Sequence, residues 1–346
     1  MKILIDILHP AHVHFFRNAV REMEGMGHEV LIASRDKDLT HRLLELYRLP
    51  YLPLSREAGS GRTLAAELIS RNLKLLRLAL KEKPDVMASI GGISTAQVGF
   101  LARIRNLIFY DTENATLSNL LSYPFASEVV TPDCYRGWVP RRRNVRYRGY
   151  HELAYLHPRR FTPDPEVLRR HGLDPGNPYS VVRFVSWRAL HDVKARGFTP
   201  EEKLQLARTL EEHGRVYITS ETPLPEQFER YRLPLPPDQI HHLLAFARLF
   251  IGESATMASE SAVLGTPFVY IDIVGRGYTD EQEKAYGLGF NYRPEQVSES
   301  IERARGILSG NLKDSERFRE SHGRMMAEKV DVTAFILERM LHAGER

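Results

Sequence analysis

The stretch MKILIDILHPAHVHFFRNAVREMEGMGHEVLIA, residues 1–33, contains a strand, a helix and a second strand in succession. Lys2–Asp6 is a short apolar run that ends in an acid, and Glu29–Ala33 is a second strand-like run. Between them, apolar residues recur at steps of three and four, as on one face of a helix: Val13, Phe16, Val20 and Met23. Two glycines, Gly25 and Gly27, end that helix. Strands separated by helices predict a parallel sheet that is covered on both faces.

The same alternation continues after this unit. Arg62–Lys83 is predicted as a long helix that ends at Pro84. Three further apolar runs follow as strands: Asp85–Ile90, Leu107–Tyr110 and Glu128–Thr131. The first part of the chain is therefore predicted as an α/β domain.

A change of composition separates this domain from a second one. Residues 132–178 carry many prolines and arginines and few apolar runs, and we place the inter-domain connection around 151–165. The alternation of predicted strands and helices then restarts: Tyr179–Val185, Pro200–His213, Arg215–Thr219, Asp238–Ala247, Leu249–Gly252, Ala255–Leu264 and Phe268–Asp272. We expect two Rossmann-like domains, residues 1–158 and 165–325, and a C-terminal helix within residues 326–346 that packs back on the first domain.

Composition excludes several classes of protein. The 346 residues suit two domains of about 150 residues each. One cysteine, Cys134, excludes an intrachain disulfide and a cysteine-built zinc site. No apolar run approaches the roughly 20 residues of a membrane helix, and we see no signal peptide, so we expect a cytoplasmic protein. The net charge of +4 is mildly basic and does not indicate a nucleic-acid partner.

Candidate functional residues follow the predicted strands, because open parallel sheets bind ligands at the carboxyl ends of their strands. The segment HPAHVH places His9, His12 and His14 at the first strand-to-helix turn. One interpretation is a general base, since imidazole titrates near neutral pH, and another is a metal site. The third is helix capping and packing. We select His12 as the candidate base and His9 as a candidate substrate contact.

Two further turns of the first domain carry candidates. Gly91-Gly92 allows a backbone to approach a ligand closely before a helix, and Ser94 follows as a candidate substrate contact or helix cap. Glu113, in the segment Asp111-Thr112-Glu113, is a candidate catalytic acid or base. Its alternative role is to stabilise the N-terminus of the next helix.

The most informative segment is GESATMASESAVLGTPFVYID, residues 252–272. Ser254 and Thr256 are predicted at a helix N-terminus, where free N–H groups and hydroxyls suit a diphosphate. Glu260 lies within that helix, and its carboxylate can accept hydrogen bonds from both hydroxyls of a ribose. The alternative is a capped helix with one exposed acid.

The spacing of Ser254, Glu260, Gly265 and Pro267 resembles the donor-binding segment of GT-B-fold enzymes. It is similar to that of the non-hydrolysing UDP-N-acetylglucosamine 2-epimerases and of the lipid II N-acetylglucosaminyltransferase. In those families the serine touches phosphate and the glutamate binds the ribose of UDP. The whole chain also resembles an uncharacterised archaeal and bacterial family of GT-B-like proteins, which shares the motifs IDILHPAHVHFF, residues 5–16, and YRGYHELAYLHP, residues 147–158. His12 falls where glycosyltransferases of this fold carry a histidine.

The resemblance implies two Rossmann-like domains that face each other across a central cleft, and glycosyl transfer from a nucleotide sugar, expected to be UDP-linked. The donor contacts expected are Ser186, Arg188, Ser254, Thr256 and Glu260. The acceptor side is expected to use His12, Glu113 and the Gly91-Gly92 turn. Helix N-termini and arginine can neutralise a diphosphate, so neither a metal nor a cofactor is required. Two alternatives stay open: epimerisation of a UDP-sugar, and a non-catalytic nucleotide-sugar binding protein.

A basic stretch at the end of the first domain is the last feature. Six arginines lie between Arg136 and Arg148. They form either a solvated loop or, through Arg141–Arg143, a contact with an anionic membrane or acidic acceptor. No recognised nucleic-acid motif accompanies them.

Overall fold

The computed structural model describes residues 1–57, 62–113, 115–184, 198–220 and 223–344. The chain forms two compact units, residues 1–160 with 330–346, and residues 161–329. Among the described residues, none of the helices combines the length and apolar character that crossing a bilayer requires. The candidates Ser186 and Arg188 lie outside the described residues.

The first unit is built on a seven-stranded sheet with the order β3-β2-β1-β4-β5-β6-β7, and all neighbouring strands are parallel. Its strands are β1 (Lys2–Ile7), β2 (Glu29–Asp36), β3 (Leu52–Arg56), β4 (Val86–Ile90), β5 (Arg105–Phe109), β6 (Glu128–Pro132) and β7 (Asn144–Tyr147). Its helices are α1 (Pro10–Gly25), α2 (Thr40–Leu46), α3 (Arg62–Glu82), α4 (Ile93–Ala102), α5 (Thr116–Ser122), α6 (Leu153–Leu156) and α14 (Val332–Gly344).

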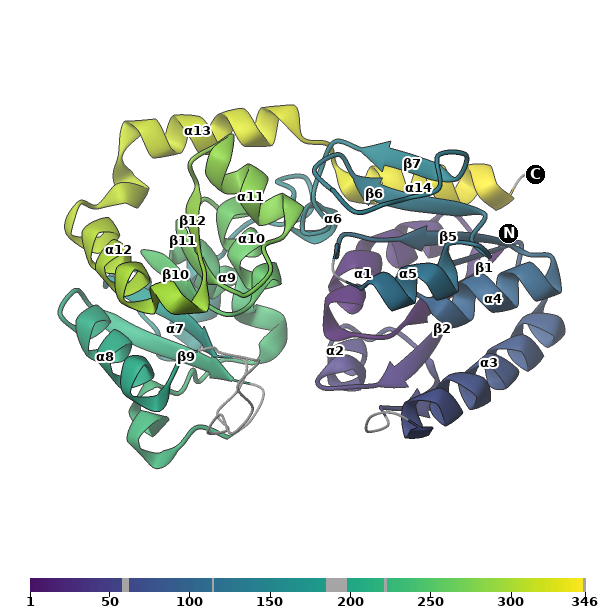
Figure 1. Ribbon diagram of the computed structural model, residues 1–346, viewed down its shortest axis with the longest axis horizontal. Coiled ribbons are helices and arrows are strands. Elements are labelled where there is room, and N and C mark those ends of the chain that lie inside the picture. The colour runs from purple at the N-terminus through teal and green to yellow at the C-terminus, as the bar shows by residue number, and fades with distance from the viewer. Residues whose placement is uncertain (58–61, 114, 185–197, 221–222, 345–346) are drawn as a thin grey trace. The chain divides into compact units, whose positions relative to one another are not determined.

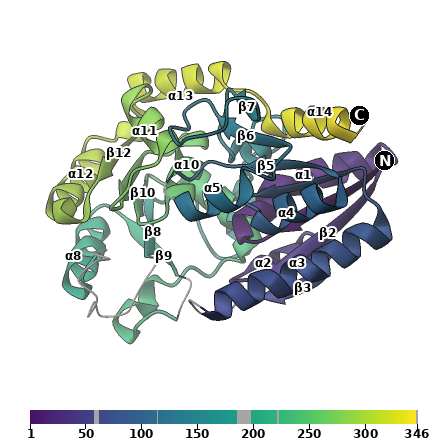
Figure 2. The same cartoon turned by 45° about the vertical axis from the view of Figure 1, so that its right-hand side comes forward.

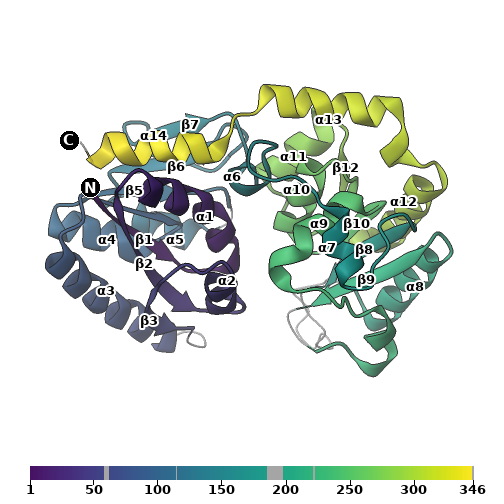
Figure 3. The same ribbon diagram turned by 180° about the vertical axis from the view of Figure 1, so that it is seen from behind.

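Helices cover both faces of this sheet. Figure 1 shows α3, α4 and α5 in front of it, and Figure 3, the view from behind, shows α1, α2 and α14 in front. The central strand β1 is therefore buried on both sides, with Ile3, Leu4 and Ile5 fully inaccessible. The predicted apolar face of α1 is confirmed, since all four of its residues are buried: Val13, Phe16, Val20 and Met23.

The second unit has a five-stranded sheet with the order β12-β11-β10-β8-β9, also parallel throughout. Its strands are β8 (Tyr179–Phe184), β9 (Arg215–Ser220), β10 (Leu249–Gly252), β11 (Phe268–Ile271) and β12 (Gly289–Tyr292). Its α-helices are α7 (Pro165–Arg170), α8 (Pro200–Glu211), α9 (Ile240–Phe246), α10 (Ala255–Val263), α11 (Gly277–Lys284), α12 (Val297–Ser309) and α13 (Glu316–Glu328). Short 3₁₀ helices are η1 (Glu226–Tyr231), η2 (Pro237–Gln239), η3 (Pro294–Gln296) and η4 (Leu312–Asp314).

One core of this unit lies between the sheet and the helices α8 and α12, which Figure 2 shows on the same side. The helices α9, α10 and α11 pack against one another in chain order, α9 on α10 and α10 on α11. The α/β prediction with parallel sheets in both parts of the chain is thus confirmed.

Three edge strands were not predicted from the sequence: β3 and β7 in the first sheet and β12 in the second. β3 is mostly exposed and contains Pro53, which an edge strand tolerates because one side of it makes no ladder hydrogen bonds. β7 has four residues and lies at the other edge, inside the stretch that composition assigned to the inter-domain connection. None of the three strands has the apolar run that marks the central strands.

Candidate functional site

The strand orders place a ligand-binding edge in each unit. In the first sheet the chain runs from β1 to β2 and β3 on one side and then crosses to β4 on the other. In the second sheet β8 has β9 on one side and β10 on the other. Ligands of open α/β sheets bind at the carboxyl ends of the strands beside such a reversal. The loops after β1, β4 and β10 lie at these reversals.

The loop after β1 holds two imidazoles in different hydrogen bonds. His9 caps α1, because its Nδ1 accepts the backbone N–H of Ala11 at 3.2 Å. His12 is half-buried, and its Nδ1 accepts the backbone N–H of Leu8 at 3.3 Å. A neutral imidazole with this bond carries its proton on Nε2, so His12 presents a hydrogen-bond donor to a ligand. The predicted role of His12 as a base stays a prediction, and in this tautomer the ring nitrogen with the lone pair is the one that Leu8 contacts.

The imidazole that is set up to accept a proton is His151. Its Nδ1 lies 3.0 Å from Oδ2 of Asp111, and the Thr112 hydroxyl donates to the other carboxylate oxygen at 3.0 Å. Only 7% of His151 is exposed, and its Nε2 has no hydrogen-bond partner among the described residues. The Nδ1–H donates to the carboxylate, which leaves the lone pair of Nε2 for a substrate proton.

Aromatic rings hold His151 in this orientation. The Phe15 ring lies 4.5 Å from it between centroids, and the Tyr147 ring stacks on it at 6.4 Å. Burial opposes ionisation of Asp111, but the neighbouring His151 and the hydrogen bonds from His151 and Thr112 outweigh it, and the pKa of Asp111 lies below its ordinary value. The carboxylate is therefore ionised at neutral pH and can stabilise an imidazolium.

The sequence analysis did not select His151. The residue lies in the motif YRGYHELAYLHP, which served only to identify a family. It follows β7, the short edge strand that was not predicted, so nothing in the sequence placed it at a carboxyl end of the sheet. The available sequence signal for this pair is an Asp that follows one strand and a His that follows another. Only the order of the strands in the sheet shows that Asp111 and His151 meet.

Glu113 and the glycine turn occupy other parts of this edge. Glu113 accepts the backbone N–H of Arg136 at 3.3 Å. Gly91 has a φ of +56°, and a Cβ on Gly92 would lie 2.0 Å from Oγ of Ser89, so the turn requires both glycines. Ser94 is buried in the first turn of α4 and does not cap the helix, which begins one residue earlier. Its predicted substrate contact stays a prediction.

The free energy of unfolding at acidic pH is expected to depend on the protonation of His12. Burial, with His9 and His151 nearby, holds the pKa of His12 well below its ordinary value of 6.5. The unfolded chain therefore binds a proton below pH 6.5 that the folded chain does not. We expect the free energy of unfolding to fall as pH drops through 6.5, by at most about 1.4 kcal/mol per pH unit, down to the folded-state pKa.

Denaturant unfolding of the wild type and of His12→Asn at several pH values measures this effect. Asparagine keeps an acceptor for the Leu8 N–H but does not titrate. The pKa values of His157 and His322 are also lowered by burial, and both remain in the variant, so the difference between the two curves isolates His12. Identical pH dependence in both proteins contradicts the prediction.

In the second unit, α10 begins directly after β10. The Ser254 hydroxyl caps it by accepting the backbone N–H of Met257 at 3.3 Å, and Thr256 is half-buried in the first turn. Gly252 ends β10 against β8, since a Cβ there would lie 2.2 Å from the carbonyl oxygen of Arg183. The N-terminus of α10 thus lies at the strand reversal, where its positive end suits an anion.

Glu260 is not the exposed acid of the alternative interpretation. It is 4% exposed, and its Oε1 lies 2.9 Å from Nε2 of His241 on α9. The reason is that α10 packs against α9, so this face of the helix points into the unit. The predicted ribose contact of Glu260 stays a prediction, and a ligand would share the carboxylate with His241.

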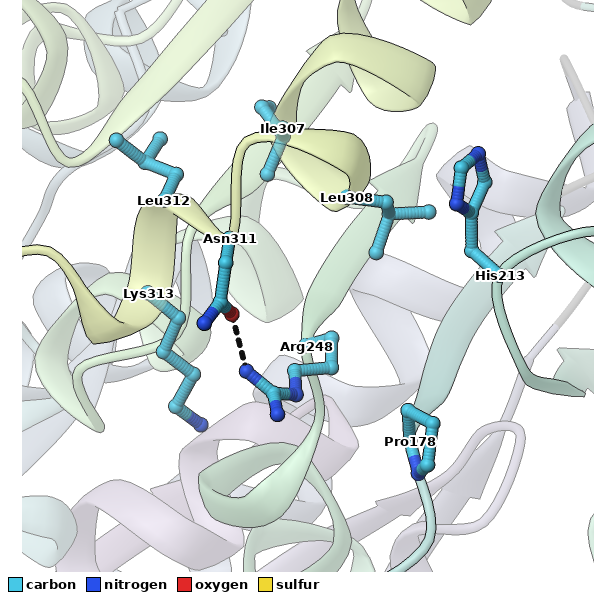
Figure 4. A pocket seen from close by; sticks show the side chains of 8 residues that line it. All are labelled: Pro178, His213, Arg248, Ile307, Leu308, Asn311, Leu312 and Lys313. Carbon is cyan, nitrogen blue, oxygen red and sulfur yellow. Dashed lines mark hydrogen bonds between the residues drawn. The ribbon is translucent and has the colours of Figure 1, made fainter.

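A separate cavity of about 210 Å³ lies at the opposite edge of the second sheet (Figure 4). Arg248, which precedes β10, donates to Asn311 there. Nζ of Lys313 donates to the carbonyl oxygens of Ala245 and Ala247, both at 2.7 Å, and so closes the end of α9. Burial and the nearby Arg248 lower the pKa of Lys313 to about 7. We assign this cavity a structural role, because it lies at the amino ends of the strands.

Metal binding has no evident site in the described part of the chain, where no group of three or more His, Cys, Asp or Glu side chains is placed to hold an ion. The His9 and His12 rings lie 5.9 Å apart between centroids, and each Nδ1 already accepts a backbone N–H.

Solved structures with a similar fold include a UDP-GlcNAc 2-epimerase and a rhamnosyltransferase. The UDP-GlcNAc 2-epimerase of Methanocaldococcus jannaschii is 13% identical with a TM-score of 0.67, and the match covers 99% of each chain. Spinosyn rhamnosyltransferase SpnG, solved with thymidine diphosphate, is 16% identical with a TM-score of 0.65 over 98% of this chain and all of that one. The GT-B-like fold predicted from the sequence is therefore confirmed.

Sequence comparison agrees with the predicted family. An uncharacterized protein of Methanocaldococcus jannaschii is 26% identical over 284 residues, which are 78% of this chain and 81% of that protein. Residues 1–334 match the family described as "Protein of unknown function (DUF354)". The chain belongs to the DUF354 family, whose structural neighbours are GT-B glycosyltransferases and UDP-GlcNAc 2-epimerases.

Proposed function

We propose that this protein transfers a glycosyl group from a nucleoside diphosphate sugar, expected to be UDP-linked, to a hydroxyl acceptor without a metal ion. The observation that carries the proposal is the buried Nε2 of His151, which lacks a hydrogen-bond partner among the described residues while Asp111 holds the opposite ring nitrogen. An orienting carboxylate, an imidazole and an acceptor nitrogen without a hydrogen-bond partner among the described residues are the parts that activate a hydroxyl nucleophile.

In this mechanism Nε2 of His151 accepts the proton of the acceptor hydroxyl while its oxygen attacks the anomeric carbon. The bond from that carbon to the diphosphate oxygen breaks, and the nucleoside diphosphate leaves. Asp111 stabilises the imidazolium that forms. His12 donates a hydrogen bond to the substrate from Nε2. After the step, the proton passes from His151 to solvent.

The second unit holds the donor in this proposal. The N-terminus of α10, with Ser254 and Thr256, faces the diphosphate, and Glu260 accepts from the ribose hydroxyls. Arg188, outside the described residues, remains a candidate for the diphosphate charge. The charge of the donor is then balanced by N–H groups and a guanidinium, so the proposal needs no cation.

Calorimetric titration with UDP in the presence of a chelator tests the donor site. We expect binding without added metal, and we expect Glu260→Gln to weaken it by about 1.5–3 kcal/mol, because a charged acceptor of the ribose hydroxyls is lost. Glutamine keeps a hydrogen-bonding group of similar size beside His241. Glu299→Gln, on α12, is the matched control. An unchanged dissociation constant in Glu260→Gln removes Glu260 from the donor site.

Product analysis separates this proposal from its two alternatives. Epimerisation is the second candidate because UDP-GlcNAc 2-epimerases have a similar fold. A transferase releases UDP only when an acceptor is present, and an epimerase changes the sugar without an acceptor. A binding protein gives tight calorimetric binding but neither product.

A further inference from the structure

Exposed apolar side chains gather on one face of the first unit. Nine of the sixteen large apolar residues that are exposed in the described chain lie on α3, α4, α5 or at Trp138. The three helices cover the same face of the sheet, with α4 between α3 and α5 (Figures 1 and 2). We call this surface the α3–α5 face. Scattered single apolar residues are normal on a protein surface, but a continuous group marks a contact surface.

The long helix α3 has apolar residues on both sides. One side packs on the sheet through three buried residues at steps of four: Arg71, Leu75 and Ala79. Ile69, Leu73 and Leu80 lie on the opposite side and are 63%, 50% and 58% exposed. The core of the unit uses only one side of this helix, and a second apolar side that is exposed is typical of a contact surface.

The neighbouring segments extend this apolar stripe. Phe100 and Leu101 are exposed at the end of α4, and Leu117 and Leu120 on α5. Trp138 is 67% exposed, and its ring lies 6.2 Å from that of Tyr123, which follows α5. An exposed tryptophan beside leucines is typical of side chains that enter the interfacial region of a bilayer.

Cations outnumber acids on the α3–α5 face. Lys74 and Arg77 are exposed on α3, and Lys81 is exposed 3.3 Å from Glu82, which Lys2 also contacts. The other acid of α3, Glu67, is paired with Arg35. The helices α4 and α5 contain no acidic residue. The partner that fits an apolar surface bordered by cations is an anionic one.

An arginine-lined hollow of about 420 Å³ opens beside the end of α4. Arg103, Arg105 and Arg143 line it together with the rings of Phe100 and Phe125. Arg143 donates to the carbonyl oxygens of Tyr123, Pro124 and Ala126, so its side chain stabilises the end of α5 rather than reaching a partner. The membrane contact predicted for Arg141–Arg143 stays a prediction, and of these three residues Arg141 and Arg142 are exposed.

We infer that the α3–α5 face docks this protein on an anionic membrane surface, with the leucines and Trp138 entering the interface and the arginines beside lipid phosphates. A second copy of the chain is the weaker occupant, because a symmetric contact would bring the same cations together. The inference is independent of the proposed reaction, since vesicle binding requires no substrate.

Sedimentation of the full chain with vesicles tests it. We expect binding to vesicles of phosphatidylcholine with an equal part of phosphatidylglycerol, and weak binding to phosphatidylcholine alone. The partition coefficient should fall about five-fold in each of three variants, Arg103→Ser, Arg141→Ser and Arg142→Ser. High salt should also lower the partition coefficient. Arg317→Ser with Arg319→Ser, exposed on α13 of the second unit, is the matched charge control.

Insertion of the apolar side chains into the bilayer is tested by separate serine variants and by tryptophan fluorescence. The triple variant Ile69→Ser, Leu73→Ser, Leu80→Ser should lower binding at least about ten-fold, whereas Leu46→Ser, at the end of α2 and 42% exposed, should not. In a Trp187→Phe background, Trp138 is the remaining tryptophan, and its emission should shift to the blue on anionic vesicles. Absence of sedimentation and of any shift at low salt overturns the inference. So does a dimer in solution that the triple variant dissociates.

Discussion

Replacing His151 by glutamine is expected to lower the turnover of glycosyl transfer by about 10²–10⁴-fold, because glutamine cannot take the proton of the acceptor hydroxyl. The affinity for the nucleotide should stay within a factor of about two, because the donor contacts belong to the second unit. Steady-state kinetics with a chosen donor and acceptor, together with calorimetry on the same preparation, measure both quantities.

Asp111→Asn separates a positioning role from a structural one. It removes the charge that stabilises the imidazolium but keeps the size of the side chain. We expect a lower turnover and a shifted pH profile, since the group that titrates in the reaction loses its carboxylate partner. A lower turnover with an unchanged pH profile would mean that Asp111 only supports the fold.

The effect of His12→Ala on turnover can be compared with that of His151→Gln. Because the Leu8 N–H occupies its Nδ1, we expect His12→Ala to lose a substrate hydrogen bond and not the base, with a smaller fall in turnover than His151→Gln. If His12→Ala is the more damaging change, the base is His12, as the sequence pattern had predicted, and the tautomer assigned from the Leu8 contact is wrong.

Arg71→Met is expected to lower the free energy of unfolding by about 3–5 kcal/mol, because it leaves a buried carboxylate without its cation. Asp6 is fully buried at the end of β1, and Arg71, 3% exposed, reaches it from α3 as an ion pair. The Thr95 hydroxyl donates to the other carboxylate oxygen at 3.1 Å. Denaturant unfolding followed by circular dichroism gives the size of the loss.

The double variant Asp6→Asn with Arg71→Met is the control for this pair. Removing both charges relieves the unpaired carboxylate, so the double variant should be more stable than Arg71→Met alone. A loss below about 1 kcal/mol in the single variant would show that water reaches the pair and that it behaves like a surface salt bridge.

Much of the fold follows from the sequence because local patterns decide it. An apolar run marks β1, because a strand that is buried on both faces must be apolar throughout. Apolar residues at three- and four-residue steps mark α1, because a helix that covers a sheet must be apolar on one face. The segment 252–272 likewise places Ser254 at a helix N-terminus. The family resemblance rests on the same local motifs, and it is confirmed.

The edge strands and the partners of polar groups depend on contacts between distant parts of the chain. Asp111 meets His151 because β5, β6 and β7 are neighbours in the sheet, an order that no local pattern carries. Glu260 is buried because α9 lies against α10, and Asp6 finds Arg71 on a helix 65 residues away. The sequence by itself therefore determined which residues follow the central strands, such as β1 and β10, but not which residues follow the edge strands. Only the tertiary structure decided which side chains meet there, because hydrogen bonds and ion pairs require groups within a few ångströms whatever their separation along the chain.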